Sequence, residues 1–170
     1  MQPRPFSTAR LDAVPLAPVH ADEMARVLSD PVLHTYTGGA PEDADTLRAR
    51  YARWTAGSPD PGERWWNWVL RVRADGRLAG YVQATVRGEQ AEAAWVVGAG
   101  WQGRGYAKEA ARGLVAHLLT TPGVRTVVAH IHPGHTASAA VAEAAGLVPT
   151  DEREDGEVRW RRTGGDQETG

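Results

Sequence analysis

The chain has 170 residues, enough for one domain with a hydrophobic core and too few to expect two. It contains no cysteine, which excludes disulfides, thiolate nucleophiles and cysteine metal sites. The net charge is −2, with 19 basic and 21 acidic side chains interspersed, so we expect no nucleic-acid partner. The sequence has no apolar run of transmembrane length and does not start like a secretory signal, so we expect a cytoplasmic protein with no membrane partner. Its Ala-, Arg- and Gly-rich composition is typical of a bacterium with a high GC content.

The first part of the chain is expected to form one strand and two helices. In chain order the expected elements are a strand at 10–16, a helix at 23–28, a loop at 35–41, a helix at 43–55 and a loop at 57–62. The strand is placed at an edge of a sheet because Pro15 has no N–H to donate to a neighbouring strand. The second helix is indicated by Leu47, Tyr51 and Trp54, which recur at helical spacing.

From residue 65 the hydrophobic period changes to two, which indicates strands. The expected elements are strands at 66–73, 78–86 and 91–97, a helix at 105–119, a strand at 124–131, a helix at 137–145, a strand at 156–162 and a disordered tail at 164–170. Asp75-Gly76 between the first two strands is a hairpin signal. This order predicts an α+β fold in which the strand-helix-strand unit at 95–131 forms a crossover.

The turn between the strand at 91–97 and the following helix has the composition of a phosphate-binding loop. Gly103 and Gly105 let the backbone approach a ligand closely, and the amides from Gln102 to Ala107 fall at a helix N-terminus, which favours an anion. A generic strand-to-helix connection is the alternative. A mononucleotide loop is not supported, because no Lys-Ser or Lys-Thr pair follows the glycines.

Three separated motifs together resemble the GNAT family of N-acetyltransferases over residues 10–162. They are Gln102-x-x-Gly105-x-Ala107; Pro133-x-His135-x-x-Ser138 with its helix ending at Gly146-Leu147; and the hairpin Asp75-Gly76 with Leu78-x-Gly80. The hairpin is similar to that of the subgroup of ribosomal-protein N-terminal acetyltransferases. His135 stands where the family usually has Asn, and Leu147 where it often has Phe.

The resemblance implies one domain at 1–163, with a mixed, largely antiparallel sheet flanked by helices and a βαβ unit that binds coenzyme A. It implies acetyl-CoA as the donor and direct attack by an amine in a ternary complex. Pantetheine is expected to bind like an extra strand where the sheet splays, with the amide of Val97 facing the thioester carbonyl. The residues expected to bind acetyl-CoA are Val96, Val97, Gly98, Gln102, Gly103, Arg104, Gly105, Tyr106, Ala107, His135 and Ser138.

The candidate catalytic residues are Glu92, His132 and Ser138. Glu92 resembles a glutamate common in the subgroup and is expected to act as a base through a water, the alternative being a solvated strand residue. His130 and His132 share strand parity, and either suits acid–base work or simple packing. We expect no metal site at these histidines, because no carboxylate lies at ligand spacing. Ser138 is expected to bind pantetheine or approach the sulfur; the alternative is a helix cap.

Residues 148–151 contain no tyrosine, although some relatives have a tyrosine acid shortly after the Gly-Phe pair. The general acid is therefore open, and a non-catalytic acyl-CoA-binding or regulatory module is the alternative function.

The acceptor is expected to be a small-molecule amine or a protein N-terminus. Trp54, Trp65 and Trp66 are candidates for an aromatic wall beside the loops at 35–41 and 57–62, which suits a cationic or ring-bearing amine. Tyr36, Trp65 and Trp66 are the residues expected to bind the acceptor. The alternative for each ring is a place in the core. A monomer and a homodimer are equally compatible with the sequence.

Overall fold

The computed structural model describes residues 2–165, in which eight strands form one sheet. The strands are β1 (Phe6–Ser7), β2 (Leu11–Pro15), β3 (Glu63–Val72), β4 (Leu78–Arg87), β5 (Gln90–Val97), β6 (Thr126–Ile131), β7 (Val148–Glu154) and β8 (Glu157–Thr163). Their order in the sheet is β1-β2-β3-β4-β5-β6-β8-β7. β5 and β6 pair in parallel, and the other neighbours pair antiparallel. The expected α+β fold with a largely antiparallel sheet is confirmed.

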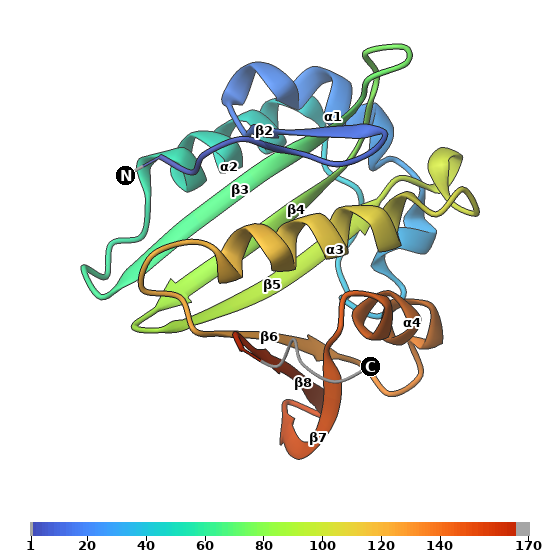
Figure 1. Cartoon of the computed structure of the whole chain (residues 1–170). Helices are drawn as coiled ribbons and strands as arrows, with labels where there is room; N and C mark the ends of the chain where they lie inside the picture. Colours follow the sequence, from blue (N-terminus) through green and yellow to red (C-terminus); the bar gives the residue numbers. More distant parts are fainter. Residues whose placement is uncertain (1, 166–170) are drawn as a thin grey trace.

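Helices cover both faces of this sheet (Figure 1). They are α1 (Ala21–Val27), α2 (Ala44–Ala56), α3 (Tyr106–Leu119) and α4 (Thr136–Ala144), with short 3-10 turns at Pro18–His20, Pro31–His34 and Ala99–Trp101. α3 and α4 pack on one face, and α1 and α2 on the other. None of the helices in the described part of the chain is long and apolar enough to cross a membrane.

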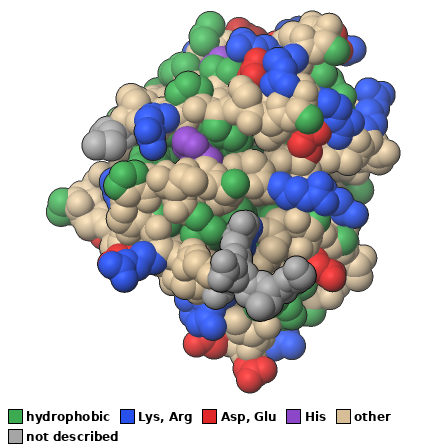
Figure 2. Space-filling model, in the orientation of Figure 1, with side chains coloured by type: hydrophobic (Ala, Val, Ile, Leu, Met, Phe, Trp, Pro, Cys, Tyr) green, Lys and Arg blue, Asp and Glu red, His purple; other side chains and the backbone are tan. Residues whose placement is uncertain are grey.

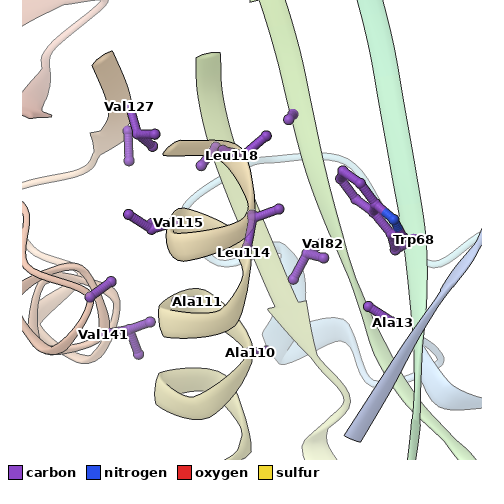
Figure 3. Packing of buried hydrophobic residues seen from close by; sticks show 14 of the residues in the cluster. Ala13, Trp68, Val82, Ala110, Ala111, Leu114, Val115, Leu118, Val127 and Val141 are labelled. Atoms are coloured by element: carbon purple, nitrogen blue, oxygen red, sulfur yellow. The ribbon is translucent and has the colours of Figure 1, made fainter. Parts of the chain in front are cut away.

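The larger core lies between α3 and the sheet (Figure 3). Leu114 and Leu118 point from α3 towards Trp68 of β3 and Val82 of β4, and all four side chains are almost fully buried. Replacing such a leucine with alanine costs about 2–5 kcal/mol of stability, because it leaves a cavity. This packing fixes α3, and therefore the glycine loop that precedes it, against the sheet.

The smaller core holds α1 and α2 on the opposite face. Met24 of α1 and Tyr51 of α2 are buried against Val69 of β3 and Leu78 of β4. Asp43 caps α2, because its side chain accepts a hydrogen bond from the N–H of Thr46. The C-terminal end of α2 lies beside the start of β3, because residues 54–56 line the same cavity as residues 63–65.

The sheet separates between β5 and β6. Their parallel pairing joins Gln90, Ala91 and Glu92 to Thr126, Val127 and Val128. Beyond Glu92, β5 continues to Val97 paired with β4 on its other side, and within residues 2–165 its edge towards β6 has no strand partner. The structure thus has the splay that the resemblance implies.

Two expectations about strands are wrong. The strand at 10–16 is not an edge, because β1 pairs outside β2. Residues 148–154, for which no strand was expected, form β7 on the outer side of β8. Of the tail expected to be disordered, residues 166–170 lie outside the described part of the chain.

Candidate functional site

The glycine loop leads into α3 with a backbone that only glycine adopts easily. Gly103 and Gly105 both have φ of +79°, and Gly105 is the left-handed N-cap of α3. The helical hydrogen bonds begin with the N–H of Glu109 and the carbonyl of Gly105. Among the described residues, the first N–H groups of α3 therefore have no carbonyl partner inside the helix, and they are available to an anion.

Glu109 clamps this loop to the β1–β2 turn. Its carboxylate accepts hydrogen bonds from the N–H of Arg10 at 2.8 Å, from Arg10 Nε at 2.7 Å and from the hydroxyl of Thr8. Arg10 Nη1 in turn donates to the carbonyl of Arg104 at 2.9 Å, and the guanidinium lies 4.4 Å from the ring centre of Tyr106. Burial raises the pKa of Glu109, but the hydrogen bonds from Thr8 and Arg10 outweigh it, so the pKa is lowered overall. The loop is thus held in shape by an ionised glutamate.

The free edge of β5 presents the backbone of Val97. The N–H of Gly98 donates to the carbonyl of Ala79 on β4 at 2.8 Å. Successive residues of a strand point their N–H and C=O groups to opposite sides, so the N–H of Val97 faces the free edge. The carbonyl of Val97 accepts a hydrogen bond from Gln102 Nε2 at 3.2 Å. By the same alternation the backbone of Val96 faces β4, so the expectation that Val96, Val97 and Gly98 all present their backbones to pantetheine is wrong for Val96 and Gly98.

Gly80 allows β4 to approach β5 closely beside this edge. A Cβ at Gly80 would lie 2.1 Å from the carbonyl oxygen of Val96 and 2.9 Å from the Cα of Val97. Any larger residue would push the two strands apart at this point. The glycine of the Leu78-x-Gly80 motif is therefore required for the close approach of β4 to β5.

Glu92 lies where the β5–β6 pairing ends, on the face of the sheet covered by α1 and α2. Its Oε1 is 2.8 Å from Nδ1 of His130 on β6. Nε2 of the same imidazole is 3.0 Å from Oε2 of Glu154, at the end of β7. The structure therefore joins Glu92 to His130 rather than to His132.

Ser138 lies on the opposite face of β5 from Glu92. It belongs to the first turn of α4, and its Oγ accepts a hydrogen bond from the indole N–H of Trp95 at 3.2 Å. Glu92 and Trp95 are three residues apart on β5, so their side chains point to opposite faces. The free edge of β5 thus has a carboxylate on one side and a hydroxyl on the other.

His132 and His135 contact Tyr36, which comes from the loop between α1 and α2. The rings of Tyr36 and His135 are stacked with centres 4.4 Å apart, and those of Tyr36 and His132 are 5.2 Å apart. The hydroxyl of Tyr36 donates to the carbonyl of Gly134 at 3.1 Å, and Nδ1 of His132 accepts from the N–H of Gly134 at 2.9 Å. Burial, and secondarily the charge of His132, lower the pKa of His135. We call the contact of Tyr36 with His135 and Gly134 the loop latch.

Trp65 and Trp66 point to opposite faces of β3. Trp66 is 5% exposed in the core on the α3 side, so its expected place in an aromatic wall is wrong. Trp65 pairs across the sheet with Thr85, which pairs with Glu92, so these three residues share a face. Trp65 also lines a cavity of about 290 Å³ together with Trp54 and Asn67.

The described residues hold no group of three histidine or carboxylate side chains arranged to bind a metal ion. The histidines at 130, 132 and 135 point into separate contacts instead, the first with Glu92 and Glu154 and the others with Tyr36.

Residues 10–148 match the family described as the acetyltransferase (GNAT) domain. The chain belongs to the GNAT acetyltransferase family. It is accordingly an acetyl-CoA-dependent acetyltransferase, and the family acts on amines such as protein N-termini and small molecules. No curated protein matches the sequence.

Solved structures of bacterial acetyltransferases share the fold. An acetyltransferase from Agrobacterium tumefaciens has a TM-score of 0.75 at 25% identity, covering 95% of this chain and 95% of that chain. A GNAT family acetyltransferase from Bacillus anthracis has a TM-score of 0.78 at 15% identity, covering 94% of this chain and 98% of that chain. RimL, a ribosomal α-N-protein acetyltransferase solved with coenzyme A, has a TM-score of 0.74 at 12% identity, covering 94% of this chain and 98% of that chain.

The residues present fit acetyl-CoA as the donor of this acetyltransferase. The positive φ angles of Gly103 and Gly105 leave the loop backbone open to a diphosphate, and the N–H of Val97 faces an edge that a pantetheine amide can pair with. A Cβ at Gly103 would meet no described atom within 4 Å, which leaves room for a ligand beside it.

Proposed function

We propose that this protein transfers the acetyl group of acetyl-CoA to a primary amine of a small molecule or a protein N-terminus, by direct attack in a ternary complex. Residues 1–163 act as one acetyltransferase domain in this proposal. The observation that carries it is the position of Glu92, a half-exposed carboxylate at the point where β5 leaves β6. Attack requires a neutral amine, and a carboxylate at this point is placed to take the proton of the ammonium form.

The residues proposed to act on the amine and on the thioester lie on opposite faces of β5. Glu92 serves the amine on the α1/α2 face, while Ser138 lies on the α4 side. Because the indole of Trp95 donates to Ser138 Oγ, the hydroxyl proton of Ser138 is left to donate to the sulfur of the leaving thiolate. The N–H of Val97, at the free edge of β5, is the candidate donor to the thioester carbonyl. This arrangement supports simultaneous binding of donor and acceptor and gives Ser138 the acid role that the missing tyrosine leaves open.

The acceptor enters along the row Glu92–Thr85–Trp65. Strands are about 4.8 Å apart, so Trp65 lies roughly 10 Å from Glu92 across β4. An acceptor whose amine reaches Glu92 therefore extends towards Trp65 and the cavity that Trp65 lines. Tyr36, from the α1–α2 loop, contacts the β6–α4 loop through the loop latch.

Initial-rate kinetics test the ternary complex. Rates measured over a grid of acetyl-CoA and amine concentrations are expected to give intersecting reciprocal plots, and radiolabelled acetyl-CoA is expected to leave no label on the protein in the absence of amine. Parallel plots with a labelled enzyme would contradict direct attack.

Acceptor profiling by mass spectrometry tests the substrate class. N-terminal peptides, polyamines, aminoglycosides and amino acids are incubated with acetyl-CoA and the protein, and products 42 Da heavier are identified. The expected result is amine-dependent acetylation by the wild type and a strong decrease with Glu92→Gln. Tight binding of coenzyme A without turnover of any acceptor would instead favour a non-catalytic module.

A further inference from the structure

His130 is enclosed by carboxylates from two different strands. Nδ1 is 2.8 Å from Glu92 Oε1, and Nε2 is 3.0 Å from Glu154 Oε2. The side chain of His130 is 12% exposed, against 40% for Glu92 and 70% for Glu154. The three side chains form a line from the end of the β5–β6 pairing to the surface of the β7–β8 hairpin.

Both ring nitrogens of His130 face acceptors. An ionised carboxylate has no proton to donate, so each nitrogen makes a hydrogen bond only if it carries its own proton. His130 therefore has a carboxylate beside each of its ring nitrogens. A neutral imidazole would place a lone pair against one of the two carboxylates.

The other charged groups around His130 are engaged elsewhere. Arg159 of β8 stands opposite His130 in the register, but its guanidinium donates to Gln90 at 2.8 Å and to Glu152. Among the described residues, His130 is thus the side chain that contacts both Glu92 and Glu154.

We propose that His130 is a positioning residue that holds Glu92 by Oε1 in its ionised form and leaves Oε2 to take the amine proton, while Glu154 keeps the ring of His130 in place. This inference rests on the proposed function of Glu92. It gives the protein a carboxylate–imidazole–carboxylate chain in which Glu92 alone is the base for the amine, acting through a water.

The proton and electron balance requires only one base. The amine nitrogen forms a bond to the acetyl carbon, the carbon–sulfur bond breaks, and its electron pair goes to sulfur. One proton of the ammonium group goes to Glu92 and then to water, and a second ends on the thiol of coenzyme A. His130 keeps its protons throughout, so its role is to orient Glu92 and to stabilise its negative charge.

The test compares His130→Ala and His130→Asn with Glu92→Gln. The pH dependence of kcat/KM for the amine is measured with coenzyme A affinity and thermal unfolding as controls. His130→Ala is expected to lower kcat tenfold to a hundredfold with little change in the KM of acetyl-CoA. Its pH profile is expected to differ from that of the wild type, because Glu92 loses its contact at Oε1.

His130→Asn separates orientation from charge. Asparagine keeps an N–H near the position of Nδ1, so this variant is expected to recover part of kcat. A wild-type pH profile and kcat in both histidine variants would overturn the inference. If Glu92→Gln is also unchanged, the proposed base fails as well; if Glu92→Gln is impaired and the histidine variants are not, only the positioning role fails.

Glu154→Gln is matched with Glu152→Gln on the same strand. Glu154→Gln removes the charge next to His130 and is expected to lower kcat severalfold with a changed pH profile. Glu152→Gln affects the contact with Arg159 and is expected to leave both quantities unchanged. Equal effects of the two variants would contradict the chain through Glu154.

Discussion

At the scale of single residues, the phosphate loop depends on Gly105. Valine at this position has to adopt φ of +79°, which costs about 1–3 kcal/mol for a β-branched residue, and its Cβ would lie 3.4 Å from Nη2 of Arg10. We expect Gly105→Val to lower the affinity for coenzyme A more than tenfold in isothermal titration calorimetry.

Gly123→Val is the control for Gly105→Val. Gly123 also has a positive φ, +89°, and among the described residues no atom lies within 4 Å of a Cβ placed there. It is therefore expected to lose similar stability while binding coenzyme A normally. Equal affinities of the two variants would contradict the assignment of the loop.

The clamp at Glu109 predicts a pH-dependent stability. Because the pKa of Glu109 is lowered in the folded protein, its contribution is fully present above its ordinary value of 4.5 and is lost as the pH falls through the lowered value. Glu109→Gln is expected to destabilise the protein by about 1–2 kcal/mol at pH 7, measured by urea unfolding, and by less at pH 3. A loss that is independent of pH would show that the charge of Glu109 contributes nothing.

Individual site residues differ in how far the sequence predicts them. Gly103, Gly105 and Ser138 follow from motifs, and the structure puts Gly105 at the N-cap of α3 and Ser138 against Trp95 of β5. The contact of Glu92 with His130 does not, because it depends on the register that pairs Glu92 with Val128. The core position of Trp66 was predictable, since neighbours in a strand point to opposite faces.

At the scale of elements, the order of strands and helices around the glycine loop follows from hydrophobic periodicity, but β7 does not. All but one of its residues are exposed, so it shows no alternation. Its signal is the turn instead: Asp155 and Gly156 have φ of +50° and +82°, the conformation that favours Asp-Gly in a hairpin. Strand β1 has two residues, too few for any period.

The loop latch predicts coupling between the α1–α2 loop and the β6–α4 loop. Tyr36→Ala removes the stack on His135 and the hydrogen bond to Gly134, whereas Tyr36→Phe removes only the latter. Since Tyr36 is 42% exposed, Tyr36→Ala is expected to leave thermal stability nearly unchanged but to increase hydrogen exchange in residues 35–41 and raise the KM of the amine severalfold. Tyr36→Phe is expected to be intermediate.

The latch is also expected to weaken in acid. The pKa of His135 is lowered below its ordinary value of 6.5, so the folded contact favours the neutral ring and loses stability as the pH falls below 6.5. Hydrogen exchange in residues 35–41, corrected for the intrinsic pH dependence, should therefore rise from pH 7.5 to pH 5.5 in the wild type. An identical rise in Tyr36→Ala would contradict the role of the latch.

At the scale of the whole molecule, the sheet separates the proposed binding of coenzyme A from the proposed binding of the acceptor. α3 and α4 hold the loop and Ser138 on one face, and α1 and α2 leave Glu92, Thr85 and Trp65 on the other. Basic and acidic side chains are dispersed around the face in view rather than gathered into one patch (Figure 2). The fold was predictable because the motifs fix the order of its central elements; the acceptor was not, because its contacts come from loops with no periodic pattern.

The most direct test of the central claim is amine-dependent release of coenzyme A from acetyl-CoA by the wild type and by Glu92→Gln, with coenzyme A affinity measured for both. The predicted result is turnover by the wild type, a decrease in kcat/KM of about a hundredfold or more in the variant, and equal affinities. Wild-type rates in Glu92→Gln would contradict the account.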